Sequence, residues 1–223
     1  MQFIREDQTA ATHDVAARLS QELGAGKRVL WLVCGGSNIK SEVAVMDQLR
    51  TRQAESLGRL TILPTDERYG EPGHADSNYR QLQDAGFDPG DASWTDILGE
   101  NLSLEATVEQ YATAVSRALA TADVVIAQFG IGGDGHIAGI LPGSPATATE
   151  NTLAAGYQSN DFIRMTLTSS ALSQVNAAYA PVYGDSKRAA LERLKRHDES
   201  FADLPSSLLY DIPEAYVYTD NDI

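Results

Sequence analysis

The stretch Asp123–Ala146 reads DVVIAQFGIGGDGHIAGILPGSPA and carries the strongest structural signal in the chain. Residues 124–129 form a short apolar run rich in β-branched side chains, and glycines follow it directly. This pattern predicts a buried strand that feeds a tight turn. Asp134 and His136 stand in the turn with one glycine between them, which predicts a carboxylate beside an imidazole at the end of a strand. Ligands of α/β proteins tend to bind at such strand ends.

A strand, a glycine turn and a helix are predicted upstream of this stretch. Residues 28–34, RVLWLVC, are almost continuously apolar, and a helical spacing of apolar residues resumes over residues 41–57. Gly35, Gly36 and Ser37 stand between the two. Free N–H groups at such a turn, with a helix dipole behind them, form a site for an anion. The alternative is a turn that only connects two elements.

A long polar segment follows the next predicted strand. Residues 60–64 are apolar, and residues 65–79, TDERYGEPGHADSNY, are more crowded with charged and polar side chains than a connection requires. In an extended segment Asp66 and Arg68 point the same way, which presents an acid beside a base. A solvated loop with internal ion pairs is the alternative.

The rest of the chain alternates helices and strands. Helices are predicted at residues 9–23, 77–85, 104–120, 169–177 and 186–196, and strands at residues 94–98, 162–168, 178–183 and 215–218. This alternation predicts an α/β protein with one domain, residues 1–223, built on a doubly wound, mostly parallel sheet with helices on both faces.

Two cations stand out in the last third of the chain. Arg164 lies inside the predicted strand 162–168, where an unpaired guanidinium would be costly to bury. Lys187 lies in the first turn of a predicted helix, where its charge opposes the helix dipole, so a cation here suggests a negative ligand. For both residues a surface position is the alternative.

The composition excludes several classes of partner. The formal net charge is −14, which would repel nucleic acid and anionic membranes. No apolar run approaches the roughly 20 residues of a membrane span, and the N-terminus lacks a signal sequence, so we expect a cytoplasmic protein. The histidines and the single cysteine form no metal-binding motif, and Cys34 is predicted to be a core residue. We therefore expect no metal and no cofactor.

The glycines after the central strand formally match the dinucleotide fingerprint G-x-G-x-x-G. Pro142 and Pro145 would interrupt the helix that this fingerprint needs, which disfavours a nicotinamide enzyme. The sequence has no G-x-S-x-G elbow and no P-loop, so it lacks the central motifs of serine hydrolases and kinases.

In its polar motifs the chain resembles the 6-phosphogluconolactonases, within the wider group that includes the glucosamine-6-phosphate deaminases. The matching motifs occur in order along nearly the whole chain: Gly35-Gly36-Ser37, Asp66-Glu67-Arg68, Ser77-Asn78, Gly130–His136, Arg164 in RMTLT, Gly184 with Lys187, and Leu204–Ser207. Each motif is weak alone, but the shared order is specific.

The resemblance implies a doubly wound fold of the NagB/RpiA/CoA transferase-like class. It implies that a sugar phosphate is held by Gly35, Gly36, Ser37, Arg164 and Lys187. It also implies that His136 is the general base, with Asp134, Asp66 and Arg68 around the reacting end. The chain departs from the family at Asn38-Ile39, which replaces the usual Thr-Pro.

Hydrolysis of 6-phosphogluconolactone to 6-phosphogluconate, in the oxidative pentose phosphate pathway, is the function that the resemblance favours. Arg68 and backbone N–H groups are the candidates to stabilise the oxyanion. Deaminases of the group resemble one another in an Asp-Glu-Tyr motif and in a glutamate five residues after the motif histidine, where this chain has Arg68 and Leu141. A non-catalytic sugar-phosphate sensor is the alternative from another class. We expect a small-molecule sugar phosphate lactone as the partner, no nucleic acid or membrane, and a monomer or small homo-oligomer.

Overall fold

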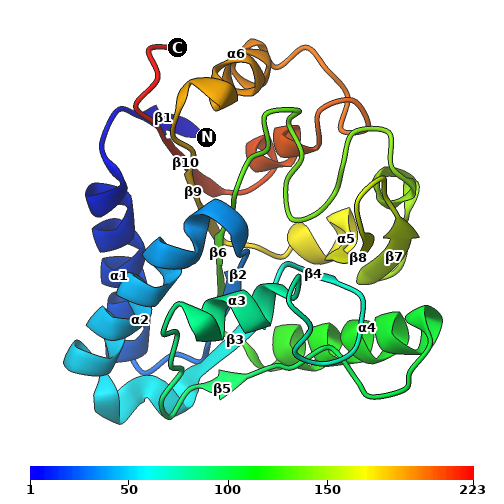
Figure 1. Cartoon of the computed structure of the whole chain (residues 1–223). Coiled ribbons are helices and arrows are strands. Elements are labelled where there is room, and N and C mark those ends of the chain that lie inside the picture. The colour runs from blue at the N-terminus through cyan, green and yellow to red at the C-terminus, as the bar shows by residue number, and fades with distance from the viewer.

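A seven-stranded sheet runs through the centre of the computed structural model, which describes residues 1–223 (Figure 1). Its strands lie in the order β1-β10-β9-β6-β2-β3-β5, and every neighbouring pair is parallel. Their bounds are β1 Gln2–Ile4, β2 Val29–Val33, β3 Leu60–Pro64, β5 Ser93–Trp94, β6 Val124–Gln128, β9 Ala177–Pro181 and β10 Glu214–Tyr218. The predicted parallel sheet is therefore confirmed.

Six α-helices surround this sheet: α1 Gln8–Gly24, α2 Ile39–Arg52, α3 Asn78–Asp84, α4 Leu104–Thr121, α5 Ser169–Leu172 and α6 Arg188–Arg196. Side-chain caps fix where three of them begin, because the side chains of Asp7, Ser77 and Ser103 accept hydrogen bonds from backbone N–H groups in the first turns of α1, α3 and α4. None of the helices is both long and apolar enough to cross a membrane.

The two faces of the sheet support two separate hydrophobic clusters. In β2 all five residues are buried, and successive side chains point to opposite faces. Trp31 and Val33 pack with α1, α2 and α3 on one face, whereas Leu30 and Leu32 join the cluster that includes α4, α5 and α6 on the other. The continuous apolar run of β2 is thus explained by burial on both sides, as expected for a doubly wound sheet.

One predicted strand belongs to a different sheet. The predicted strand at 162–168 is present as β8, Ile163–Leu167, but it pairs antiparallel with β4, Asp66–Arg68, and with β7, Ala154–Gln158. The segment 65–79, predicted as a loop, therefore begins as a strand, and β7 was not predicted. Apolar spacing indicates that a segment is extended and buried, but it does not identify the strand with which it pairs.

Several elements are shorter than predicted. The helix predicted at 41–57 ends at Arg52, because Gln53 leaves helical geometry, and a 3-10 helix, Ala54–Arg59, follows it. The helix predicted at 169–177 is only the four residues of α5, and the strand predicted at 94–98 is only the two residues of β5. Three 3-10 helices matter below: Gly36–Asn38, Asp185–Lys187 and Pro205–Tyr210.

Candidate active site

A pocket of about 230 Å³ opens at the carboxyl ends of the central strands. Within the sheet, β2 has β3 as its neighbour on one side and β6 as its neighbour on the other. The chain runs from β2 outward through β3 to β5, and then returns to β6 and runs outward in the opposite direction. The order of the strands therefore reverses between β2 and β6. Gly35 and Gly36, which follow β2, line the pocket together with Gly130, which follows β6. The pocket thus lies at a topological switch point, where open α/β sheets bind their ligands.

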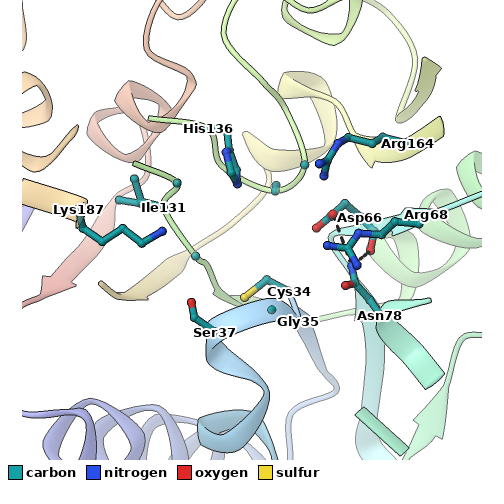
Figure 2. Close-up of a pocket in the computed structure, with 15 residues that line it drawn as sticks. Cys34, Gly35, Ser37, Asp66, Arg68, Asn78, Ile131, His136, Arg164 and Lys187 are labelled. Atoms are coloured by element: carbon teal, nitrogen blue, oxygen red, sulfur yellow. Dashed lines mark hydrogen bonds between the residues drawn. The ribbon is translucent and has the colours of Figure 1, made fainter. Parts of the chain in front are cut away.

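Eight of the nine side chains or glycines predicted for the site line this pocket. They are Gly35, Gly36, Ser37, Asp66, Arg68, His136, Arg164 and Lys187. Figure 2 shows His136 above the middle of the pocket, Lys187 reaching in from one side, and Asp66 and Arg68 on the other. Asp134, the ninth residue, does not line the pocket and contacts His136 from behind.

Asp134 and His136 form a short hydrogen bond. The Oδ1 atom of Asp134 lies 2.7 Å from Nδ1 of His136 and also accepts the backbone N–H of His136 at 3.1 Å. This bond favours the tautomer with a proton on Nδ1, so Nε2, which forms no hydrogen bond within the chain, carries the lone pair. The bond to His136 lowers the pKa of Asp134 to about 2, although partial burial opposes this. The carboxylate is therefore ionised at neutral pH.

Glycines make room for this pair. A Cβ atom on Gly132 would overlap Nδ1 of His136 and Oδ1 of Asp134. Gly135 has φ +92°, a conformation that strains other residues, and a Cβ there would overlap the side chain of Leu204. The glycines that resemble a dinucleotide fingerprint thus allow Asp134 and His136 to meet within one turn.

Asp66 is a second carboxylate in the pocket wall and is 7% exposed. Its Oδ1 accepts the hydroxyl of Thr65 at 3.0 Å, and its backbone carbonyl accepts Nδ2 of Asn78 at 3.0 Å. Gly139 lies so close that a Cβ there would be 2.8 Å from Oδ2 of Asp66. These contacts fix the carboxylate while its Oδ2 atom has only a long contact, 3.5 Å, with Asn78.

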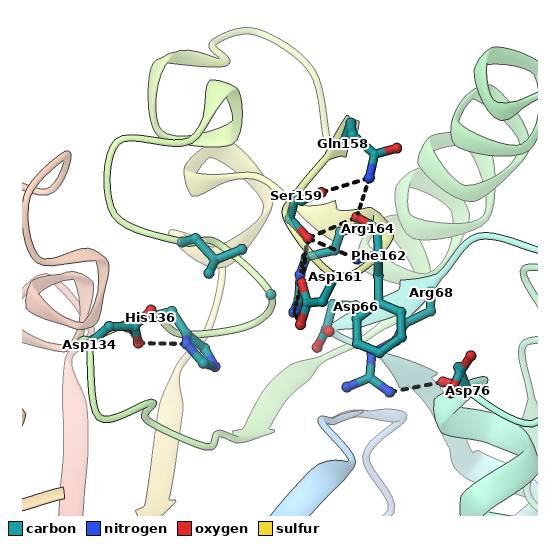
Figure 3. A network of polar contacts seen from close by, with 12 residues as sticks. Asp66, Arg68, Asp76, Asp134, His136, Gln158, Ser159, Asp161, Phe162 and Arg164 are labelled. Atoms are coloured by element: carbon teal, nitrogen blue, oxygen red, sulfur yellow. Dashed lines mark hydrogen bonds and ion pairs between the residues drawn. The ribbon is translucent and has the colours of Figure 1, made fainter. Parts of the chain in front are cut away.

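Two guanidinium groups lie near one aromatic ring at the end of the pocket that lies away from Lys187 (Figure 2 and Figure 3). The guanidinium carbons of Arg68 and Arg164 lie 5.0 and 5.5 Å from the centre of the Phe162 ring. Arg164 also pairs with Asp161 at 3.1 Å, so part of the charge of this buried guanidinium is compensated within the chain. Its Nη1 atom forms no hydrogen bond in the chain. Arg68 donates from Nη1 to the carbonyl of Asp76.

The opposite end of the pocket combines a glycine turn and a lysine. Gly36 and Ser37 open a 3-10 helix, where the first N–H groups have no acceptor within the helix, and α2 continues from it. Lys187 forms no ion pair within the chain. A free ammonium and free backbone N–H groups are the arrangement that binds a phosphate.

The sequence model of the family described as "Glucosamine-6-phosphate isomerases/6-phosphogluconolactonase" matches residues 5–217. The chain belongs to this family. The resemblance inferred from the polar motifs is thereby confirmed, and the match covers both ends of the pocket.

Two curated relatives show how this chain compares with other members of the family. A 6-phosphogluconolactonase of Pseudomonas aeruginosa is 29% identical over 188 residues, which is 80% of this chain and 76% of that protein. A probable chloroplastic 6-phosphogluconolactonase 3 of rice, Oryza sativa subsp. indica, is 26% identical over 154 residues, which is 63% of this chain and 47% of that protein. The match thus spans about half the length of the rice relative.

Solved structures confirm the fold. A 6-phosphogluconolactonase from Shewanella baltica OS155 superposes with a TM-score of 0.78 at 20% identity, covering 97% of this chain and 96% of that one. A monomeric glucosamine-6-phosphate deaminase superposes with a TM-score of 0.81 at 19% identity, covering 98% and 97%. Both activities of the family therefore occur on this fold, and the choice between them depends on the residues of the site.

Cys34 differs from the prediction in one respect. It is 7% exposed, as a core residue should be, but it also lines the floor of the pocket (Figure 2). Burial raises the pKa of its thiol well above the ordinary value, with a further contribution from the nearby Glu42 carboxyl. The thiol is therefore neutral at physiological pH and is a poor nucleophile.

Two residues that matter to the site were not predicted as site residues, although Asn78 belongs to one of the matching motifs. Asn78 lines the pocket, and Glu42 lies fully buried beneath it, accepting the backbone N–H groups of Cys34 and Gly35 at 2.7 and 3.4 Å. A signal for Glu42 exists in the sequence, because it occupies the same helical stripe as Val45, Met46 and Leu49, where a charged side chain is unexpected.

The replacement of Thr-Pro by Asn38-Ile39 also has a structural role. The side chain of Asn38 is buried and donates from Nδ2 to the carbonyl of Phe129 at 3.0 Å. It therefore joins the turn after β2 to the turn after β6. No group of three or more His, Cys, Asp or Glu side chains is arranged to hold a metal ion.

Proposed function

We propose that this protein hydrolyses 6-phosphogluconolactone to 6-phosphogluconate. The observation that carries the proposal is the Asp134–His136 pair, whose imidazole lines a pocket with an unpaired lysine at one end. The curated relatives described above are named as 6-phosphogluconolactonases, which supports the same substrate.

The phosphate of the substrate is held at the end of the pocket formed by Gly35, Gly36, Ser37 and Lys187. The N–H of Gly35 already donates to Glu42, so Gly36 and Ser37 supply the backbone donors. These contacts are a charge-assisted hydrogen bond and helix-terminus interactions with the anion. Arg164, which the resemblance assigned to the phosphate, lies at the other end of the pocket beside Arg68, where its free Nη1 atom can donate to an oxygen at the lactone end of the substrate while Asp161 and Ser159 hold the rest of the guanidinium.

Attack on the lactone begins at Nε2 of His136. This nitrogen takes a proton from a water molecule as the water oxygen bonds to the lactone carbonyl carbon. The imidazolium that forms is stabilised by the ionised Asp134 at Nδ1. The negative charge that develops on the carbonyl oxygen is stabilised by Arg68 and by backbone N–H groups of the pocket.

Collapse of this tetrahedral species breaks the bond between the carbonyl carbon and the ring oxygen. His136 returns its proton from Nε2 to the departing ring oxygen, which becomes a hydroxyl group. The new carboxylic acid then loses a proton to solvent. Asp66 lies in the pocket wall beside Arg68, where its Oδ2 atom can accept a hydrogen bond from a sugar hydroxyl and so orient the ring.

The same site disfavours the two alternatives. Leu141 stands where the deaminases resemble one another in carrying a glutamate for ring opening, and it does not line the pocket. A sensor needs no acid–base pair, whereas Asp134 and His136 are held together by two hydrogen bonds.

Turnover of freshly prepared 6-phosphogluconolactone by wild type and His136→Ala tests the proposal. General-base catalysis is worth about 10²–10⁴ in rate, so the variant should lose about that factor in kcat with little change in KM, after subtraction of spontaneous hydrolysis. His13→Ala is a matched control, because His13 contacts Asp14 on the surface of α1.

Ammonia release from glucosamine 6-phosphate is measured alongside lactone hydrolysis and should be absent. Ammonia release without lactone hydrolysis would reverse the assignment. Binding of sugar phosphates without turnover of either substrate would favour the sensor.

A further inference from the structure

The loop that carries His136 has little regular structure of its own. Residues 129–144 follow β6 and contain only isolated bridges that join Ile137 to Ile131 and Ile140. Within the turn, Gly132 N–H donates to the carbonyl of His136 and Gly135 N–H donates to the carbonyl of Gly132. These bonds set the shape of the turn but do not fix its position relative to the pocket.

The position of the turn is fixed by the last third of the chain. The carbonyl of Gly135 accepts the backbone N–H of Ser206 at 3.0 Å. Gly133 lies so close to the 3-10 helix at 185–187 that a Cβ there would be 2.8 Å from the carbonyl oxygen of Ser186. Figure 1 shows this loop and α6 at the same end of the molecule.

Arg193 of α6 makes the only side-chain hydrogen bond from the last third of the chain to residues 132–136, whereas Tyr157 and Thr166 bond to Gly139 and Ala138 farther along the same loop. Its Nη1 atom donates to the backbone carbonyl of Asp134 at 2.9 Å. Its Nε atom donates to Glu199 at 2.9 Å, and its Nη2 atom donates to the carbonyl of Asp203 at 3.0 Å. One guanidinium therefore ties together α6, the segment 199–203 and the residue that orients His136.

We propose that Arg193 is a positioning residue that holds the Asp134–His136 pair in register with the pocket. The inference rests on the proposed function, since it concerns the geometry of the proposed base. Arg193 does not line the pocket and acts only through the backbone of Asp134. The planar guanidinium reaches its three partners in different directions at once, which a lysine ammonium cannot do.

Loss of this contact should affect the chemical step more than binding. The phosphate-binding groups lie on other segments, Gly36–Ser37 and Lys187, and none of them bonds to Arg193. A displacement of about 1 Å at a reacting group can cost about a hundredfold in rate. Arg193→Ala should therefore lower kcat by about 10–100-fold with KM changed by less than about twofold.

Arg196→Ala is the matched control. Arg196 lies on the same helix and contacts Asp198 and Glu199 at 3.6 Å, but it does not reach the loop. It should keep wild-type kcat. Guanidinium ion at millimolar concentration should restore part of the kcat of Arg193→Ala, measured against sodium chloride at equal ionic strength, and should not restore His136→Ala. Arg193→Lys, which keeps the charge, should show a smaller loss of kcat and serves if Arg193→Ala does not fold.

The outcomes separate this inference from the proposed function. Wild-type kcat in both Arg193 variants, or an equal loss in Arg196→Ala, would overturn the positioning role while leaving His136 as the base. A fall in kcat accompanied by an equal rise in KM would also overturn it, because a general loss of structure would then explain the result. Wild-type kcat in His136→Ala would instead overturn the proposed function.

Discussion

Glu42 allows a quantitative prediction about stability, because it is a fully buried carboxyl group without a cation beside it. Its Oε1 atom accepts two backbone N–H groups, its Oε2 atom has no hydrogen-bond partner, and its side chain is 0% exposed. Burial raises the pKa of Glu42 from 4.5 to about 7, and the charge of Asp66 contributes, while the bonds from Cys34 oppose the rise. The folded protein therefore holds a proton that the unfolded chain releases near pH 4.5.

The stabilisation from this proton is fully present below the pKa of the unfolded chain. It is lost as pH rises and is gone above the pKa of the folded protein, about 7. A tenfold change in an ionisation equilibrium is worth about 1.4 kcal/mol, so a rise from 4.5 to about 7 corresponds to about 3 kcal/mol at high pH. Part of this loss has already occurred at pH 5, which leaves about 2–3 kcal/mol between pH 5 and pH 8.

Glu42→Gln replaces the carboxyl by a neutral group of the same shape. The difference in the free energy of unfolding, variant minus wild type, should therefore increase by about 2–3 kcal/mol between pH 5 and pH 8. Urea unfolding followed by the fluorescence of the two tryptophans, the buried Trp31 and the half-buried Trp94, measures both proteins across this range. Glu55→Gln, at an exposed glutamate without an ion pair, should show no such trend. A difference between wild type and Glu42→Gln that stays constant with pH would refute the reasoning.

Three further predictions concern the site. Lys187→Ala should raise KM for the phosphorylated lactone with a smaller effect on kcat, because the phosphate is bound in both ground and transition states; an unchanged KM in steady-state kinetics would argue against a phosphate at Lys187. Asp134→Asn should lower kcat by about 10²–10⁴, because the amide no longer stabilises an imidazolium and permits the wrong tautomer of His136. The bond to His136 lowers the pKa of Asp134 to about 2, so the wild-type carboxylate is charged across the working range, and a variant with the kcat and pH–rate profile of wild type would show that this charge has no part in catalysis. Gly132→Ala should abolish turnover yet keep the circular dichroism spectrum, because the new Cβ overlaps both members of the pair; retained activity would show that the turn can yield.

The sequence by itself determined the class of fold and the edge of the sheet at which the site lies. The apolar runs at β2, β3 and β6 are each followed by glycines or polar residues, and parallel strands present their carboxyl ends at one edge. Local spacing was sufficient for these features, because both the apolar run and the turn that follows it lie within a few residues of each other. The glycine turn at Gly35–Ser37 and the Asp134–His136 pair could be predicted for the same reason.

Only the tertiary structure decided which distant segments meet. The strand at 163–167 pairs with Asp66–Arg68 in a separate sheet, Glu42 lies beneath the turn after β2, and Arg193 bonds to a carbonyl 59 residues away. Asp134 stands behind His136 instead of lining the pocket. Each of these features depends on contacts between segments far apart in the chain. The periodicity of a segment records how much of it is buried, whereas the partner that buries it is selected by packing over the whole molecule.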